Sequence, residues 1–127
     1  METQPIPKDY QHTSPAGAEV RVLMNNHHGG MAHCTLKNQK ISKAVQHKTV
    51  SEFWHILSGK GAIWRKNDTE ENVTVLEAGI SIDIPLGTQF QYRSDEGDLV
   101  FICMTMPPWP GHDEVNYVNT YWEPFEP

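Results

Sequence analysis

The sequence contains few cysteines and no long hydrophobic run, and each shortage excludes a class of protein. Only two of its 127 residues are cysteines, Cys34 and Cys103. Both stand in apolar segments, where reduced core thiols are expected rather than a disulfide framework or a zinc knuckle. No apolar run approaches the roughly 18 residues that a membrane span needs, and Met1–Tyr10 lacks the apolar stretch of a signal peptide. We therefore expect a cytoplasmic protein without a membrane partner.

Positive charge is also scarce. Ten Lys and Arg residues stand against 16 Asp and Glu residues, which gives a net charge of −6 and disfavours nucleic acid as a partner. The two signs are separated along the chain: residues 20–51 contain no acid, and residues 94–127 contain no Lys or Arg. Complementary faces of one fold or of a dimer would explain this separation, and so would a basic mouth that attracts an anionic ligand.

Several sequence motifs of common enzyme classes are missing. The chain has no phosphate-binding glycine loop, no Gly-x-Ser-x-Gly and no Cys-x-x-Cys. Nucleotide-binding, serine-hydrolase and thioredoxin-type functions therefore have no support. No segment keeps a helical period of apolar residues, so helix should be minor.

The dominant pattern is a series of short segments rich in Val, Ile, Phe, Trp and Thr, which predicts strands. The predicted strands are Val20–Met24, Met31–Leu36, Lys43–His47, Glu52–Leu57, Ala62–Arg65, Val73–Leu76, Ile80–Ile84, Phe90–Arg93 and Leu99–Met106. Turn residues separate them, as at Ser58–Gly61 and Asp95–Gly97. Evenly spaced short strands in a chain of this length predict one all-β domain, a sandwich or a barrel such as a jelly roll.

The two ends of the chain differ from this pattern. We expect residues 1–18 to form an arm, residues 19–107 the barrel, and residues 108–127 a proline-rich segment. A disordered tail would rarely keep so many aromatic residues, so the last segment should pack on the barrel or on a second subunit. Its apolar surface predicts a homodimer. The aromatic residues are Trp109, Tyr117, Tyr121, Trp122 and Phe125.

One segment, Val45–Gly61, resembles the first sequence motif of the cupins, which reads His-x-His, three or four spacers, Glu, six spacers and Gly. His47, Glu52 and Gly59 stand at the positions of its second His, its Glu and its Gly. Within the part of the chain that resembles cupins, about Val20 to Met106, the fold implied is a double-stranded β-helix, here with proline-rich terminal arms.

A second segment matches the second cupin motif, Gly-x5-Pro-x-Gly-x2-His, through Gly79, Pro85 and Gly87. The chain is most similar to small single-domain bacterial cupins that share three further segments with it. These are Ser42–Val50, Ile84–Thr88 and Thr105–Gly111.

The resemblance implies a metal site that this chain has partly lost. Metal cupins bind an ion with three His and one Glu, and carried over residue by residue these positions hold Val45, His47, Glu52 and Phe90. Two protein ligands hold a divalent ion weakly. We therefore expect no cofactor. The alternative is a weakly held divalent ion on His47 and Glu52, with His33 as a substitute ligand.

The retained pair has a chemistry of its own. Strand alternation and the resemblance place His47 and Glu52 inside the barrel, where a His beside a carboxylate can act as a general acid and base. The wall around them should be mostly apolar, as in small-molecule sites. The expected substrate-binding residues are Lys43, Val45, Trp54, Trp64 (or its neighbour Ile63) and Phe90.

The His47–Glu52 pair and its apolar surroundings are compatible with three functions. The first is a lyase, isomerase or epimerase that uses the His47–Glu52 pair on a small molecule and needs no metal. The second is a metal-dependent enzyme, an oxygenase or a phosphosugar isomerase, with a rebuilt ligand set. The third is a ligand-binding protein without catalysis.

Overall fold

The computed structural model describes residues 1–123, and over these the chain is almost entirely strand. Phe125, the last aromatic residue of the proline-rich segment, lies outside the described residues. The only helical element in the described range is a 3-10 turn, η1 (His112–Glu114), and no helix there is long and apolar enough to cross a membrane. The strands are β1 (His12–Thr13), β2 (Glu19–Asn26), β3 (Gly29–Leu36), β4 (Val45–His47), β5 (Ser51–Lys66), β6 (Glu71–Glu77), β7 (Ser81–Ile84), β8 (Gln89–Met106) and β9 (Val115–Tyr117). The prediction of an all-β fold is confirmed.

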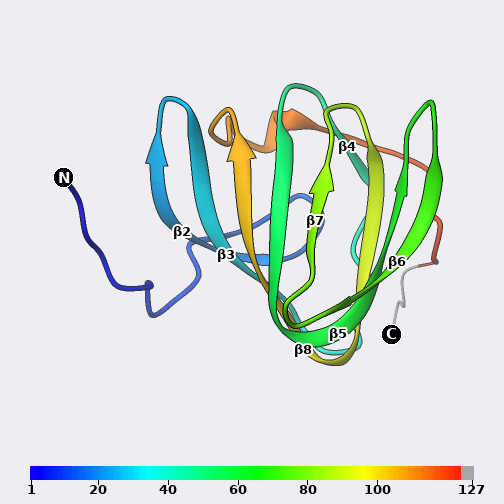
Figure 1. The fold of residues 1–127 in the computed structure, drawn as a ribbon, viewed down its shortest axis with the longest axis horizontal. Helices are drawn as coiled ribbons and strands as arrows, with labels where there is room; N and C mark the ends of the chain where they lie inside the picture. Colours follow the sequence, from blue (N-terminus) through cyan, green and yellow to red (C-terminus); the bar gives the residue numbers. More distant parts are fainter. Residues whose placement is uncertain (124–127) are drawn as a thin grey trace.

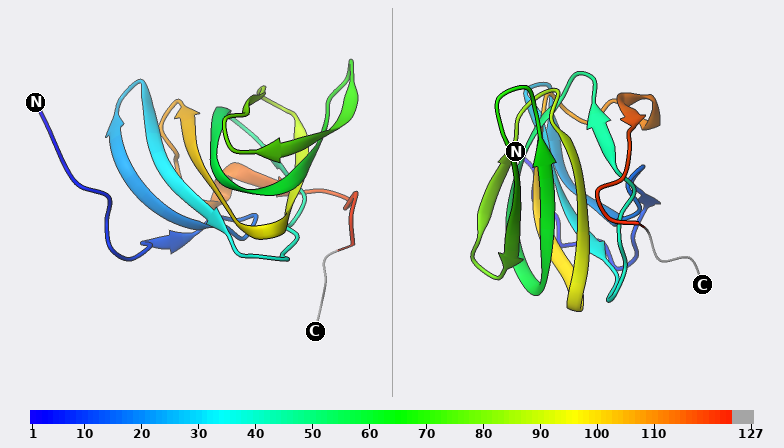
Figure 2. Two further views of the ribbon diagram at one scale, coloured as in Figure 1. Left: turned by 60° about the horizontal axis from the view of Figure 1, so that its bottom comes forward. Right: turned by 90° about the vertical axis from the view of Figure 1, so that its right-hand side faces the viewer.

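All strands pair antiparallel within one curled sheet. Its main path runs β1-β2-β3-β8-β4-β9, and β5 joins it along β8 while also pairing with β6 and β7. The two longest strands, β5 and β8, pair almost throughout, from Ser51 opposite Met106 to Lys66 opposite Gln89. Figures 1 and 2 show how these strands bend together, so that the sheet curls round its interior. The apolar core residues face that interior.

Two predicted turns, Ser58–Gly61 and Asp95–Gly97, are wrong, because β5 and β8 continue through both segments. The register of the pair shifts three times between Ile56 and Gly61, which marks bulges where the strands bend. Gly59 has a positive φ of 84°, and a Cβ atom at Gly61 would collide with the carbonyl oxygen of Arg93. The glycines therefore allow a bend and a close approach within a strand rather than a turn between strands.

Alternation along β5 decides which side chains face the interior. Glu52, Trp54 and Ile56 are buried, while Phe53 and His55 between them are exposed. Successive side chains of a strand point to opposite faces of the sheet, so this pattern places the Glu52 carboxylate inside.

Both ends of the chain contribute to the barrel. β1 pairs with β2, and Ala16 and Ala18 belong to the core. At the other end, β9 pairs with β4, and the Gln91 side chain accepts hydrogen bonds from the backbone N–H groups of Tyr121 and Trp122, at 2.9 and 2.8 Å. The C-terminal segment, drawn orange to red in Figure 1, thus packs on its own barrel.

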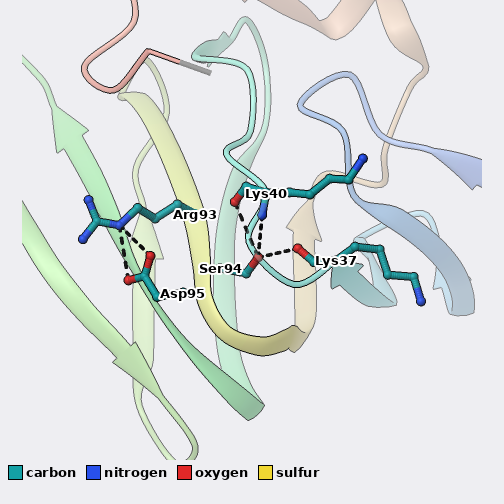
Figure 3. A network of polar contacts seen from close by, with 5 residues as sticks. All are labelled: Lys37, Lys40, Arg93, Ser94 and Asp95. Carbon is teal, nitrogen blue, oxygen red and sulfur yellow. Dashed lines mark hydrogen bonds and ion pairs between the residues drawn. The ribbon is translucent and has the colours of Figure 1, made fainter. Parts of the chain in front are cut away.

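The loop before β4 is fixed to the bend of β8 by a polar network (Figure 3). The Ser94 hydroxyl donates to the carbonyl of Lys37 and accepts from the backbone N–H of Lys40 at 3.1 Å. Beside it, Arg93 donates to Asp95 at 2.9 Å. The network holds the start of the segment that carries His47.

Candidate functional site

The polar centre of the barrel is the pair His47 and Glu52. His47 ends β4 and Glu52 lies at the start of β5, so a short connection brings the two side chains together. Each residue is only 6% exposed, and Nδ1 of His47 lies 3.6 Å from Oε2 of Glu52. The other carboxylate oxygen, Oε1, accepts a hydrogen bond of 2.8 Å from the Trp54 indole N–H. Glu52 is therefore held by one neighbour and faces His47 with its free oxygen.

Two aromatic rings fix the orientation of the His47 imidazole. Phe90 lies edge-on to it at 5.2 Å between ring centroids, and Trp109 at 5.4 Å. Nδ1 has no hydrogen-bond partner among the described residues and is turned toward Glu52. Nε2 is then the nitrogen left to meet a ligand. When the imidazole carries its proton on Nδ1, the lone pair of Nε2 is free to act as a base.

The pair opens onto a cavity of about 160 Å³ inside the barrel. An engineered apolar cavity of about 150 Å³ is large enough to bind benzene, so this space has room for a small molecule. Five of the residues that the sequence suggested line it together: Val45, His47, Glu52, Trp54 and Phe90.

Two other predicted ligand-binding residues, Lys43 and Trp64, do not line this cavity. Lys43 lies before β4 and outside any strand, so alternation from Val45 does not apply to it; it is exposed, with its ammonium 5.5 Å from the centre of the Tyr117 ring. Trp64 faces away from Ile63, which is in the core, and stacks on Tyr121 at 5.4 Å. The C-terminal segment buries Trp64 from outside, a contact that a strand pattern cannot reveal.

Sequence reasoning missed several polar groups in the cavity wall. Tyr92, two residues after Phe90 on β8, follows from alternation and was detectable. Cys34 and Cys103 line the wall from β3 and β8, and the arm adds His12 and Ser14. Nothing in the sequence of the arm predicted its position against the barrel.

Burial keeps these groups uncharged. It raises the pKa of Tyr92 well above the ordinary value, with further contributions from the Cys34 thiol and the Glu52 carboxylate. The adjacent Cys34 thiol, burial and Glu52 likewise raise the pKa of Cys103. Burial and the nearby His112 lower the pKa of His12. In the cavity wall the Tyr92 phenol and the Cys103 thiol are therefore protonated, and the His12 imidazole is neutral.

The donor set does not fit a cupin-type metal ion. Val45 and Phe90, opposite one another across β4 and β8, occupy two ligand positions with apolar side chains. His33, the suggested substitute, lies between the inward-facing Ala32 and Cys34 and so points to the other face of β3, where burial and Arg21 lower its pKa. Within residues 1–123 no three His, Cys, Asp or Glu side chains are grouped to hold an ion.

Glu114, in the C-terminal segment, binds the loop that joins His47 to Glu52. Its carboxylate accepts hydrogen bonds from the backbone N–H groups of Thr49 and Val50, at 2.8 and 2.9 Å, and from the Thr49 hydroxyl. Burial raises the pKa of Glu114, but these hydrogen bonds and the nearby His47 outweigh it and lower the pKa below its ordinary value of 4.5. Glu114 thus fixes the loop between His47 and Glu52.

Solved structures share this fold. Ectoine synthase from P. lautus superposes with a TM-score of 0.74 at 15% sequence identity, covering 97% of this chain and 94% of that one. A Klebsiella pneumoniae protein with a double-stranded β-helix domain gives 0.68 at 15% identity, covering 87% and 92%. Oxalate decarboxylase from Bacillus subtilis gives 0.74 at 13% identity over 87% of this chain, which spans only 30% of that longer protein.

These likenesses define the class of fold. The chain is a double-stranded β-helix, a jelly-roll barrel of the cupin type, as the sequence predicted. No family model matches the sequence, and no curated protein matches it either.

Proposed function

We propose that the barrel binds a small molecule and transfers a proton to or from it, as a lyase, isomerase or epimerase does. The observation that carries this proposal is the contact between His47 Nδ1 and Glu52 Oε2 in the wall of the cavity. The Glu52 carboxylate, 3.6 Å from Nδ1, stabilises the protonated imidazole, while Nε2 takes up or returns the proton of the ligand. Such an enzyme needs no cofactor.

The fold is compatible with such chemistry. Ectoine synthase and oxalate decarboxylase are enzymes by name, so this type of barrel accommodates reactions on small molecules. The cavity also has the composition of a ligand site, with an apolar wall and a few convergent polar groups.

Deuterium incorporation tests the proposal whatever the product of the reaction is. The protein is incubated in D₂O with a panel of small metabolites, and loss of substrate C–H signals is followed by NMR. We expect exchange or product formation with at least one compound, and His47→Gln should slow it by about 10²–10⁴-fold.

A matched control is available on the next strand along the chain. His55 is exposed on the outer face of β5, where Nδ1 lies 2.7 Å from the Ser81 hydroxyl, so His55→Gln should leave the rate unchanged. Equal rates for the protein and His47→Gln on every compound that reacts would contradict the proposal.

A further inference from the structure

The cavity wall contains one fixed charge. Among the residues that line it within the described range, Glu52 is the only Asp or Glu, and there is no Lys or Arg. Tyr92, Cys103 and His12 are held neutral by their surroundings. A phosphate or carboxylate ligand would meet no fixed positive charge there and would face the Glu52 carboxylate.

The rest of the wall is unusually rich in aromatic rings. Trp54, Phe90, Tyr92, Phe101 and Trp109 all line the cavity. Trp54 packs edge-to-face with Phe90 and Tyr92, at 6.1 and 4.8 Å between centroids, and stacks on Phe101 at 3.9 Å, so the rings of the wall lie at different angles to one another. The π faces of such rings attract cations, most of all those that give up little hydration when they enter an apolar space.

The size of the cavity limits the ligand further. A volume of about 160 Å³ is close to that of a cavity that binds benzene, which corresponds to roughly five to eight non-hydrogen atoms.

We infer that the cavity binds a small organic cation, an alkylated ammonium whose charge is matched by the Glu52 carboxylate and the surrounding rings. The inference rests on the proposed function of the cavity as a ligand site and adds the class of ligand.

A pair of isosteric probes tests the effect of ligand charge separately from ligand shape. Choline and its neutral analogue 3,3-dimethyl-1-butanol have nearly the same shape, and 3,3-dimethylbutanoate serves as an anionic probe of similar size. Binding of each to the whole protein is measured by isothermal titration calorimetry. We expect choline to bind at least about tenfold more tightly than the neutral analogue, the range of a desolvated cation–π contact, and 3,3-dimethylbutanoate not to bind.

Two variants locate the source of the preference. Glu52→Gln should remove the difference between choline and the neutral analogue. Glu71→Gln is the matched control, because Glu71 accepts a 2.8 Å hydrogen bond from the Trp64 indole as Glu52 does from Trp54, but outside the cavity. If Glu52→Gln does not fold, Trp109→Leu gives the second measurement and should weaken choline more than the neutral analogue.

The outcomes separate this inference from the proposed function. Equal or tighter binding of the neutral analogue, binding of 3,3-dimethylbutanoate, or no binding of choline at tens of millimolar would overturn the cation assignment. The proton-transfer proposal would survive any of these results, because it is judged by deuterium exchange and not by these probes.

Discussion

The indole N–H of Trp54 donates to Oε1 of Glu52 at 2.8 Å, and this contact decides which carboxylate oxygen faces His47. Both residues come from the same face of β5, two positions apart. The indole therefore holds the acid of the pair in place without contributing a charge.

Replacing Trp54 by Phe should destabilise the protein and disturb the pair. The change removes a buried hydrogen bond to a carboxylate and part of a core side chain, so we expect a loss of about 2–4 kcal/mol in the free energy of unfolding. Urea denaturation measures it. Trp64→Phe removes a similar contact, to Glu71 at a part-buried position, and should cost less. Equal losses of unfolding free energy in the two variants would show that the hydrogen bond from Trp54 to Glu52 stabilises the protein no more than the bond from Trp64 to Glu71.

Glu114 should make the stability of the fold depend on pH in the acidic range. Its pKa in the folded protein lies below the ordinary value of 4.5. The ionised Glu114 carboxylate therefore makes its full contribution to the free energy of unfolding at a pH above 4.5, and this contribution is lost as the pH falls through the lower, folded-state pKa. We expect Glu114→Gln to be less stable than the parent protein at neutral pH, and the gap between the two to narrow on acidification. Thermal unfolding from neutral pH to about pH 3 measures this, and a gap that is constant with pH would contradict it.

The protein should not retain a metal ion. Val45 and Phe90 replace two ligands, so protein purified without added metal should carry well under one ion per chain. Elemental analysis after dialysis is the measurement. Stoichiometric zinc, iron, manganese or nickel would show a rebuilt ligand set and favour the metal-dependent alternative.

We propose that the chain forms a homodimer through the outer face of the sheet. Among the described residues, the C-terminal segment that suggested a dimer packs on this chain's own barrel, where Tyr121 stacks on Trp64. On the outer face of the sheet, Phe53 is 55% exposed beside Met104. Asp83 there is paired with Arg65 at 3.6 Å, so a second copy would meet little net charge despite the overall −6.

Light scattering tests the dimer at micromolar concentration. The expected mass is twice the 14.5 kDa of the chain. Phe53→Glu should reduce it to that of one chain, because the carboxylate would be buried at the interface. A parent protein that is already monomeric would refute the proposal.

The sequence predicted the fold and the centre of the site because both depend on short-range patterns. The resemblance to the first cupin motif and the alternation on β5 predicted that His47, Glu52 and Trp54 face the interior, and all three line the cavity. The bends at Gly59 and Gly97 were predicted as turns, because a glycine with positive φ occurs both in tight turns and in bends within a strand.

The remaining errors come from contacts between distant segments. Tyr121 covers Trp64, and the N-terminal arm brings His12 to the cavity. Neither contact produces a local pattern in the sequence. Lys43 was misplaced because alternation was extended beyond the end of a strand.

The most direct test of the central claim is a double-mutant cycle on the pair. His47→Gln, Glu52→Gln and the double variant are compared by the rate of deuterium exchange on a substrate found in the panel, with thermal stability measured in parallel. If the two side chains work as one unit, each single change should cost about as much as both together, on the order of 10²–10⁴-fold. Near-parental exchange by the folded double variant would contradict the claim that His47 and Glu52 carry the chemistry.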